Sequence, residues 1–332
     1  MREEKQTAAI LMAVYNGEKF LREQLDSILA QNFRDWELYV SDDGSTDESR
    51  KILEEYREKD HRIAGIYHNE GPHGAFCNFY SLMRRIRESN PSPAYFFYCD
   101  QDDIWEPEKL EVSVKALQEA ESTYGQIPLL CYSDLRMMDE AGNPAPETIA
   151  QGRRIELTNP LDIFFAHRYV WGTTMGHNRA LWERLVLPED LSEEISHDNY
   201  LAKYAAVYGK ILYLDQPLVR YRRHGGNVSS MAKRYGILDG LKRALTRMPE
   251  VVNNHAKTYY ASLYALRHMP QKTDLTEELE NAFSKGGIRA LSFVKKHRIR
   301  YSGNLLNRIA FVWILGTGAY KETKWFQEEQ KA

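Results

Sequence analysis

The sequence predicts an α/β fold with a Rossmann-like, mostly parallel sheet flanked by helices and a mainly helical C-terminal extension. Three observations lead to this prediction. Over the first 130 residues, short apolar runs alternate with segments of helical period. Acidic clusters directly follow two of these runs, and beyond about residue 230 the chain is mostly helical in pattern.

The predicted elements follow in chain order. Apolar runs indicate strands at Ala8–Val14, Glu37–Val40, Ile63–Tyr67, Tyr95–Cys99 and Leu129–Tyr132. Helices are predicted between them, from apolar residues at helical spacing: Phe20, Leu21, Leu25, Ile28 and Leu29; Ile52, Leu53 and Tyr56; Phe76, Phe79, Met83 and Ile86; Leu110, Val114 and Leu117. A capping box at Ser45–Glu48 and Pro107 are expected to begin the second and fourth helices. Strands joined by helices imply right-handed crossovers, with a ligand site beyond the carboxyl ends of the strands.

Composition excludes several classes of function. Lys and Arg number 44 against 47 Asp and Glu, so no overall field favours nucleic acid as a partner. The three cysteines are widely spaced, form no CxxC motif and are expected to be buried in a reducing compartment. The charged start lacks the apolar stretch of a signal peptide, and the run Ile309–Leu315 is short of the roughly 20 residues that a spanning helix needs. We therefore expect a cytoplasmic protein.

The first acidic cluster is Asp42–Asp43, which follows the second predicted strand and precedes Gly44–Thr46. Two interpretations apply. Asp, Gly and Ser are favoured in a tight turn for local reasons, and a carboxylate at this edge also accepts hydrogen bonds from a ribose or a base.

The second cluster, Asp100–Asp103, follows the apolar run Tyr95–Cys99. In extended backbone, positions i and i+2 share a face, so Asp100 and Asp102 can address one ligand. Carboxylate oxygens suit Mg²⁺ or Mn²⁺, and Mg²⁺ commonly uses one or two carboxylates together with substrate phosphates. Asp103 is expected to cap the helix that follows.

Two later segments complete the candidate site. Asp198 opens a predicted helix after Ser196 and His197, where it is either a helix cap or a functional carboxylate. The basic, glycine-containing stretch Arg222–Asn227 follows a strand-like run, and either binds phosphate or metal or forms an ordinary surface turn.

This order of motifs resembles the glycosyltransferase family 2 enzymes of GT-A fold over roughly residues 7–230. The matching segments are Ala13–Gly17, Asp42–Asp47, Asp100–Trp105, His197–Asp198, and Arg223–His224 with Asn227. Further segments are similar to bacterial rhamnosyltransferases of rhamnose-rich wall polysaccharides: Gly74 with Asn78–Tyr80, Asp100–Trp105, Gly172–Met175 and Leu212–Pro217.

The resemblance implies a role for each matching residue. Nucleotide-sugar binding falls to Ala13, Val14, Tyr15, Asn16, Asp42, Gly74, Asn78, Asp100 and Gln101. Asp102 and His224 would hold Mg²⁺ or Mn²⁺, and Asp198 would be the general base. The acceptor side or its loop would include Trp171, Gly172, Thr173, His197, Arg222 and Arg223. The family often has an acid before the base, where this chain has His197.

The resemblance implies an inverting enzyme that moves a sugar, rhamnose from dTDP-rhamnose, onto a hydroxyl of a glycan or lipid-linked glycan in polysaccharide synthesis. A transferase for another UDP- or dTDP-sugar remains open, as does an inactive nucleotide-sugar-binding subunit, which would not need Asp198 or His224.

A dehydrogenase would carry GxGxxG after its first strand, where this chain has only Gly17. A nucleotidyltransferase would need a glycine-rich, basic first loop, which is also absent. A hydrolase with paired carboxylates would not need the nucleotide-sized first half.

We expect a catalytic domain over residues 1–230, with a nucleotide-binding half (1–130) and an acceptor half (131–230), and a helical, basic extension over 231–332. Between Lys285 and Arg308 the extension has seven Lys or Arg residues and no acid. Such a segment either lies on an anionic membrane, at the inner face of the plasma membrane, or forms solvated helices that cover the catalytic core.

Overall fold

The computed structural model describes residues 7–89, 93–153, 159–165, 170–187, 195–225, 248–300 and 305–327. The chain divides into two compact units. The first contains residues 1–156 and 170–228, and the second contains residues 157–169 and 229–332. The short stretch 157–169 therefore belongs to the C-terminal unit, although it precedes much of the first unit in sequence.

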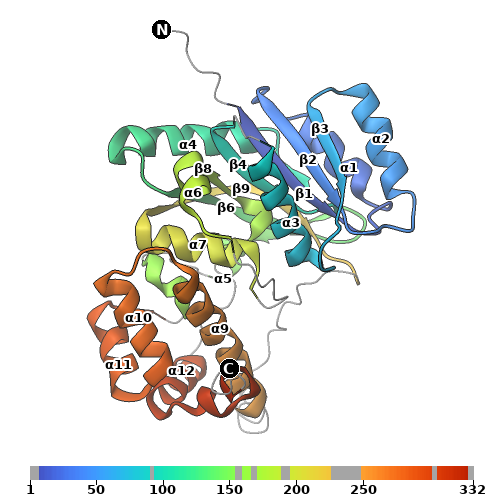
Figure 1. The fold of residues 1–332 in the computed structure, drawn as a ribbon. Coiled ribbons are helices and arrows are strands. Elements are labelled where there is room, and N and C mark those ends of the chain that lie inside the picture. Colours follow the sequence, from blue (N-terminus) through green and yellow to red (C-terminus); the bar gives the residue numbers. More distant parts are fainter. Residues whose placement is uncertain are drawn as a thin grey trace. The chain divides into compact units, whose positions relative to one another are not determined.

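The first unit is built on one curled sheet, with strand order β3-β2-β1-β4-β8-β6-β9-β5 and with β7 paired to β6 (Figure 1). Its parallel half contains β1 (Ala8–Val14), β2 (Trp36–Asp42), β3 (Ile63–His68) and β4 (Tyr95–Cys99). The other half is mixed and contains β5 (Ile104–Trp105), β6 (Leu129–Met138), β7 (Pro144–Thr148), β8 (Met175–Asn178) and β9 (Lys210–Arg222). Strand β8 runs antiparallel between β4 and β6, while β6 and β9 are parallel. These observations confirm the predicted fold class.

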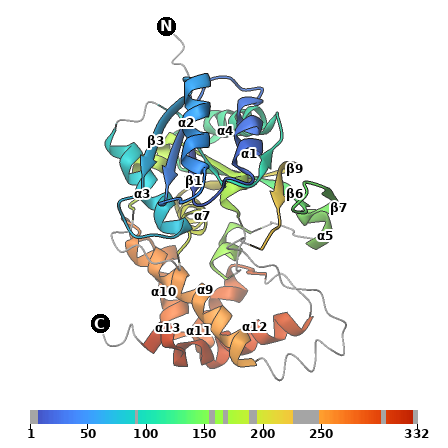
Figure 2. The same cartoon turned by 90° about the vertical axis from the view of Figure 1, so that its right-hand side faces the viewer.

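Helices cover both faces of this sheet (Figures 1 and 2). They are α1 (Leu21–Leu29), α2 (Ser49–Lys59), α3 (Ala75–Glu88), α4 (Lys109–Tyr124), α5 (Ile149–Arg153), α6 (Arg179–Arg184) and α7 (His197–Tyr208). A 3₁₀ turn, η2, spans Gly172–Thr174.

Strand β4 shows how the alternation of side chains places the helices. Phe96 stacks on Trp182 of α6 with ring centroids 4.2 Å apart. Tyr98 points to the same face and packs against Phe79 of α3 at 6.0 Å. Phe97 points the other way, where the buried Lys109 of α4 lies 5.3 Å above its ring. The all-apolar sequence of β4 follows from this double coverage.

Two predicted helix starts and one predicted helix cap were wrong. Helix α2 begins at Ser49 rather than in a capping box at Ser45–Glu48, because the Ser45 hydroxyl is engaged by Asp42. Helix α4 begins at Lys109, two residues after Pro107. Asp103 does not cap this helix; its Oδ1 accepts a hydrogen bond from the Arg222 backbone N–H at 3.1 Å instead.

The strand register brings the expected binding segments to one edge. Val14, the last residue of β1, lies opposite Asp42, the last residue of β2. On the other side of β1, Met12 pairs with Cys99, so Asp100 emerges beside the end of β1. The loops that follow these three strands therefore meet at the carboxyl edge of the parallel half.

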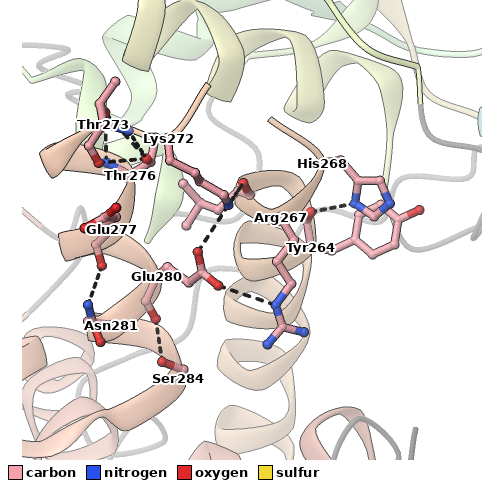
Figure 3. Close-up of polar contacts among 11 residues, drawn as sticks. Tyr264, Arg267, His268, Lys272, Thr273, Thr276, Glu277, Glu280, Asn281 and Ser284 are labelled. Carbon is pink, nitrogen blue, oxygen red and sulfur yellow. Dashed lines mark hydrogen bonds and ion pairs between the residues drawn. The ribbon is translucent and has the colours of Figure 1, made fainter. Parts of the chain in front are cut away.

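The second unit consists of η1 (Pro160–Phe164), α9 (Met248–His268), α10 (Asp274–Lys285), α11 (Gly287–Lys296), α12 (Leu305–Thr317), η3 (Ala319–Glu322) and α13 (Lys324–Gln327). Aromatic rings form its core: Phe165 packs on Phe283 at 4.9 Å, and Tyr259 on Tyr320 at 5.0 Å. Figure 3 shows the polar contacts between α9 and α10, including a capping box made by Thr273 and Thr276. No helix among the described residues is long and apolar enough to span a bilayer.

Candidate active site

The loop after β1 is joined to the acidic loop after β4 by Gln101. Its Oε1 accepts from the Tyr15 N–H at 2.7 Å and its Nε2 donates to the Tyr15 carbonyl at 2.9 Å. A Cβ at Gly17 would lie 2.6 Å from Oε1 of Gln101, so a side chain there would displace the Gln101 amide from this position. Two segments predicted to bind the nucleotide sugar are thus held together at one edge of the sheet.

Asp42 and Asn16 are linked through Ser45. The buried Asp42 carboxylate accepts from the Ser45 N–H and hydroxyl. The Ser45 hydroxyl oxygen in turn accepts from the Asn16 N–H at 2.9 Å, and the Asn16 Oδ1 accepts from the Thr46 N–H at 2.8 Å. The sequence analysis placed Asp42 and Asn16 correctly at one edge but missed Ser45, which it assigned to a helix cap.

Asp43 organises the loop before α3 rather than facing the same side as Asp42. Its buried carboxylate accepts from the Asn69 side chain at 2.6 Å and from the Gly74 N–H at 2.8 Å. The buried Asn78, one turn into α3, donates to the Ser41 carbonyl at 2.9 Å, while its Oδ1 has no hydrogen-bond partner among the described residues. Gly74 and Asn78 therefore support the end of β2, and the Asn78 Oδ1 is a polar atom left for a further partner.

Three carboxylates crowd the loop after β4. Burial raises the pKa of Asp100 well above its usual range, and the nearby negative charges of Asp102 and Asp198 raise it further. Burial and the charges of Asp102 and Asp100 likewise raise the pKa of Asp103, whose side chain is inaccessible to solvent. A cation would relieve this repulsion, because an opposite charge stabilises the ionised form of each carboxyl.

The loop after β9 closes over this cluster. His224 Nε2 lies 2.6 Å from Asp102 Oδ2, so the two predicted metal ligands are in direct contact. The buried Arg222 guanidinium donates to the carbonyls of Asp102 and Glu140 and to the Glu23 carboxylate. Arg222 thus ties three segments together. Arg223 and His224 line a shallow groove of about 640 Å³, together with Met137, Met138 and Pro144.

Asp198 lies in the first turn of α7, whose N-cap is Ser196 rather than Asp198. Its Oδ2 accepts from the Gly172 N–H at 3.0 Å. It lies close enough to Asp100 for its negative charge to raise the pKa of that carboxyl. The structure therefore brings together the segment 171–173, Asp198 and the acidic loop, as the resemblance implied.

His197 is buried beside this carboxylate. Its ring lies 4.0 Å from the Phe79 ring, and neither ring nitrogen has a hydrogen-bond partner among the described residues. A Cβ at Gly172 would lie 2.8 Å from the His197 Nε2, which explains a glycine at this position. Burial lowers the pKa of His197 to about 4, so the ring is neutral at pH 7.

Lys203 lies near the Asp198 carboxylate and is not among the residues predicted from the sequence. It is buried in α7, where burial lowers its pKa to about 7 and the Asp198 charge opposes this shift. The sequence gives no signal for this burial, because at helical spacing Lys203 lies opposite the apolar side chains Leu201, Tyr204 and Ala205, where a solvated lysine is expected.

The other predicted residues are distributed around this edge. Thr173 is buried and accepts from the Trp105 indole N–H at 3.4 Å, and Trp171 precedes it as the N-cap of η2. Asn227 lies outside the described residues. Among the residues that the structure describes, no three His, Cys, Asp or Glu side chains are grouped closely enough to hold a metal by themselves. Asp102 and His224 thus offer two protein ligands, and a cation there would need further oxygens.

Comparison with known proteins identifies the family. The family model described as "Glycosyl transferase family 2" matches residues 9–181, which is more than half of the chain. The chain belongs to glycosyltransferase family 2. The matched region contains the loops after β1, β2 and β4, and the resemblance stated from the motifs is confirmed.

Relatives of this family 2 chain include the dTDP-rhamnosyl transferase RfbG of Shigella flexneri, 29% identical over 67% of the chain and 76% of that protein. Another is the glycosyltransferase GlyA of Streptococcus pneumoniae, 28% identical over 66% of the chain and 31% of that protein. An uncharacterised glycosyltransferase of a Nostoc strain is 25% identical over 66% of the chain and 65% of its own length. The alignment thus spans less than two thirds of some relatives.

Solved structures with a similar fold include Staphylococcus aureus TarS (residues 1–349) in complex with UDP-GlcNAc, with a TM-score of 0.55 and 16% identity over 94% of this chain and 80% of that one. The mannosyltransferase PcManGT of Pyrobaculum calidifontis, in complex with GDP-Man and Mn²⁺, has a TM-score of 0.51 and 15% identity over 96% of this chain and 87% of that one. At these identities the likeness is one of fold, and it agrees with the GT-A architecture.

Proposed function

We propose that this family 2 glycosyltransferase transfers a sugar from a nucleotide diphosphate donor to an acceptor hydroxyl, with inversion at the anomeric carbon. One observation carries the proposal. The strand register brings Asn16, Asp42 and Asp100 to a single edge of the sheet, and Asp198, in the first turn of α7, lies near Asp100. Such an edge is where an open α/β sheet binds its ligand.

The donor is expected to occupy the loops after β1, β2 and β4. Asp42 and Asn16 supply acceptors for the base or ribose, and the Gln101 amide holds the backbone of Tyr15 in position for it. The oxygen ligands of Asp102 and the nitrogen of His224 fit Mg²⁺ or Mn²⁺, with donor phosphates as further ligands. When bound, this cation would neutralise the departing nucleoside diphosphate.

The acceptor hydroxyl is expected to approach Asp198. A single displacement with inversion requires one base and no protein nucleophile. Asp198 is proposed as this base because its carboxylate is hydrogen-bonded to the Gly172 N–H of the acceptor-side turn. The neutral ring of His197 and the side chain of Lys203 are both buried near this carboxylate. Trp171 belongs to the same turn and is proposed to contact the acceptor, while the buried Thr173 holds this turn against Trp105.

We further propose that dTDP-rhamnose is the donor and that the acceptor is a glycan or lipid-linked glycan at a membrane surface. The rhamnose assignment is supported by the motif similarities around Asp100–Trp105 and Leu212–Pro217, and by the 29% identity to RfbG. Inversion would turn a β-linked nucleotide sugar into an α-linked product.

A donor-turnover screen tests the proposal. The purified chain is incubated with dTDP-rhamnose, UDP-glucose, UDP-GlcNAc and GDP-mannose, with Mn²⁺, with Mg²⁺ or with a chelator, and the released nucleoside diphosphate is measured. We expect turnover of dTDP-rhamnose that needs a divalent cation. Turnover of a UDP-hexose alone would refute the rhamnosyl donor and leave the transferase intact.

The variant Asp102→Asn examines the metal site, since it removes one hard oxygen ligand from a site with few protein ligands. We expect most turnover to be lost. Asp274→Asn, an exposed carboxylate in the first turn of α10, is the matched control and should keep its turnover. Binding of a nucleotide sugar without turnover of any donor, under all metal conditions, would favour an inactive binding subunit instead.

A further inference from the structure

Helix α12 carries a row of exposed apolar side chains. Leu305 is 72% exposed, Ile309 56%, Val312 49% and Trp313 46%. Their spacing of three, four and eight residues puts them on one face of the helix. Burying such side chains in a globular fold would be favourable, and a contiguous apolar patch left in solvent marks an interaction surface.

The opposite face of α12 is already used by the fold of the C-terminal unit. Phe311, Ile314 and Leu315 are buried, and the Phe311 ring packs on Phe165 at 6.0 Å. The exposed row is therefore distinct from the face that α12 packs into the core of its unit. It is a second apolar face, which the described part of this unit does not cover.

Helix α11 extends the patch. A Cβ at Gly316 of α12 would lie 3.1 Å from Leu291 of α11, so these helices touch at the end of the exposed row. One turn before Leu291 on α11 stands Ile288, which is 87% exposed. We call Ile288, Leu305, Ile309, Val312 and Trp313 the apolar face.

Basic side chains accompany the apolar face. Seven Lys or Arg residues and no acid lie between Lys285 and Arg308. Arg308 is exposed and stands between Leu305 and Ile309 in α12. Lys285, Arg289 and Lys295 are exposed at or near α11. Lys296 differs from these, because it is paired with Glu278 at 2.6 Å. The exposed apolar side chains thus belong to a part of the chain in which exposed basic side chains are frequent.

We propose that the apolar face docks onto an anionic lipid surface, with Trp313 at the level of the headgroups. The chemistry of the face matches that of a bilayer interface, which accepts apolar and indole side chains and attracts Lys and Arg through its negative potential. The proposal goes beyond the transfer reaction and does not depend on it.

The alternative partner for the apolar face is a second copy of the chain, and the positive charge of the segment Lys285–Arg308 disfavours it. An isologous contact through this face would bring two acid-free basic segments together, and like charges at an interface oppose association. An anionic membrane instead pairs each exposed Lys and Arg with a lipid phosphate.

Vesicle sedimentation tests the proposal with the full chain. The protein is mixed with phosphatidylcholine vesicles that do or do not contain phosphatidylglycerol, at low and high ionic strength. We expect binding to the anionic vesicles that weakens with salt. Vesicles with brominated acyl chains should quench tryptophan fluorescence, and Trp313→Phe should remove most of this quenching.

Two variants separate the apolar and basic contributions. Ile309→Ser/Trp313→Ser should weaken binding at least about tenfold through lost apolar burial. Its control, Tyr124→Ser/Val186→Ser, removes similarly exposed side chains from the first unit and should bind normally. Arg289→Gln/Arg308→Gln should weaken binding roughly 30-fold at about 1 kcal/mol per charge. Its control is Arg50→Gln/Lys115→Gln, in α2 and α4.

Three results would overturn the proposal. The first is wild-type protein that stays in the supernatant with anionic vesicles at low ionic strength. The second is equal binding by Ile309→Ser/Trp313→Ser. The third is a dimer in light scattering that this double variant abolishes, with no vesicle binding, since the face would then join copies of the chain. Donor turnover in solution should be the same for all these variants, so a failure here is distinct from a failure of the proposed activity.

Discussion

Replacing Asp198 by Asn separates its chemical role from its structural one. The carboxylate accepts two hydrogen bonds, from the Gly172 N–H to Oδ2 at 3.0 Å and from the Asn199 N–H to Oδ1 at 2.6 Å, and an asparagine Oδ1 can keep one of them. Loss of the charge removes a repulsion from Asp100 and an attraction to Lys203, and these two effects oppose each other. We therefore expect the free energy of unfolding to change by about 1 kcal/mol or less.

Turnover should respond much more strongly. Loss of general-base help typically lowers rate by roughly 10²- to 10⁴-fold, which corresponds to about 2.7–5.5 kcal/mol of transition-state stabilisation. Donor affinity, measured by calorimetry, should persist, because Asn16, Asp42 and Asp102 are unchanged. The assay is nucleoside diphosphate release from the preferred donor, with urea unfolding as the stability check and Asp274→Asn as the control. A folded Asp198→Asn variant with near-normal turnover would refute the base, and His197 or Asp103 would be examined next.

Two further predictions concern the buried polar groups of the first unit. Arg222→Lys should lower the free energy of unfolding by about 2–4 kcal/mol in urea titrations, because lysine cannot serve the Asp102 and Glu140 carbonyls and Glu23 at once; a loss below about 0.5 kcal/mol would contradict this. His197 has a pKa of about 4 in the fold against about 6.5 in the unfolded chain, so between these values the unfolded state binds more protons and stability is lost as pH falls. His197→Gln should therefore show a shallower fall in unfolding free energy over this range, by about 1.4 kcal/mol per pH unit, and an unchanged slope would mean that His197 titrates normally.

The parallel half of the sheet was predictable because its signals are local. Strand β1 has the predicted bounds, Ala8–Val14, since all its residues are apolar and all but Ala13 are buried. The meeting of Asp42 and Asp100 at one edge followed from the rule for parallel strands. Strand β8, in contrast, was not predicted: its four residues, Met175–Asn178, have no strand-like periodicity, and their burial depends on insertion between β4 and β6.

The partners of the site residues were less predictable than the site itself. Arg222 was considered for the acceptor side or its loop, yet its guanidinium reaches Glu23, 199 residues away in sequence. Lys203 was missed because its pKa depends on burial in the assembled fold. The capping-box prediction at Ser45 was wrong for a similar reason. A serine hydroxyl can cap a helix or hydrogen-bond to other residues, and the Ser45 hydroxyl donates to Asp42 and accepts from the Asn16 N–H instead.

The pairing of Gln101 with Tyr15 has a consequence for the exchange of loops between enzymes of this family. Both hydrogen bonds from Gln101 to Tyr15 involve main-chain atoms, so the exposed Tyr15 side chain can be changed to suit another donor without loss of these bonds. Gly17 has no such freedom, because any side chain there would meet Gln101. A chimera that imports the acidic loop from a relative should therefore import its first loop as well, unless both contain this glutamine and glycine.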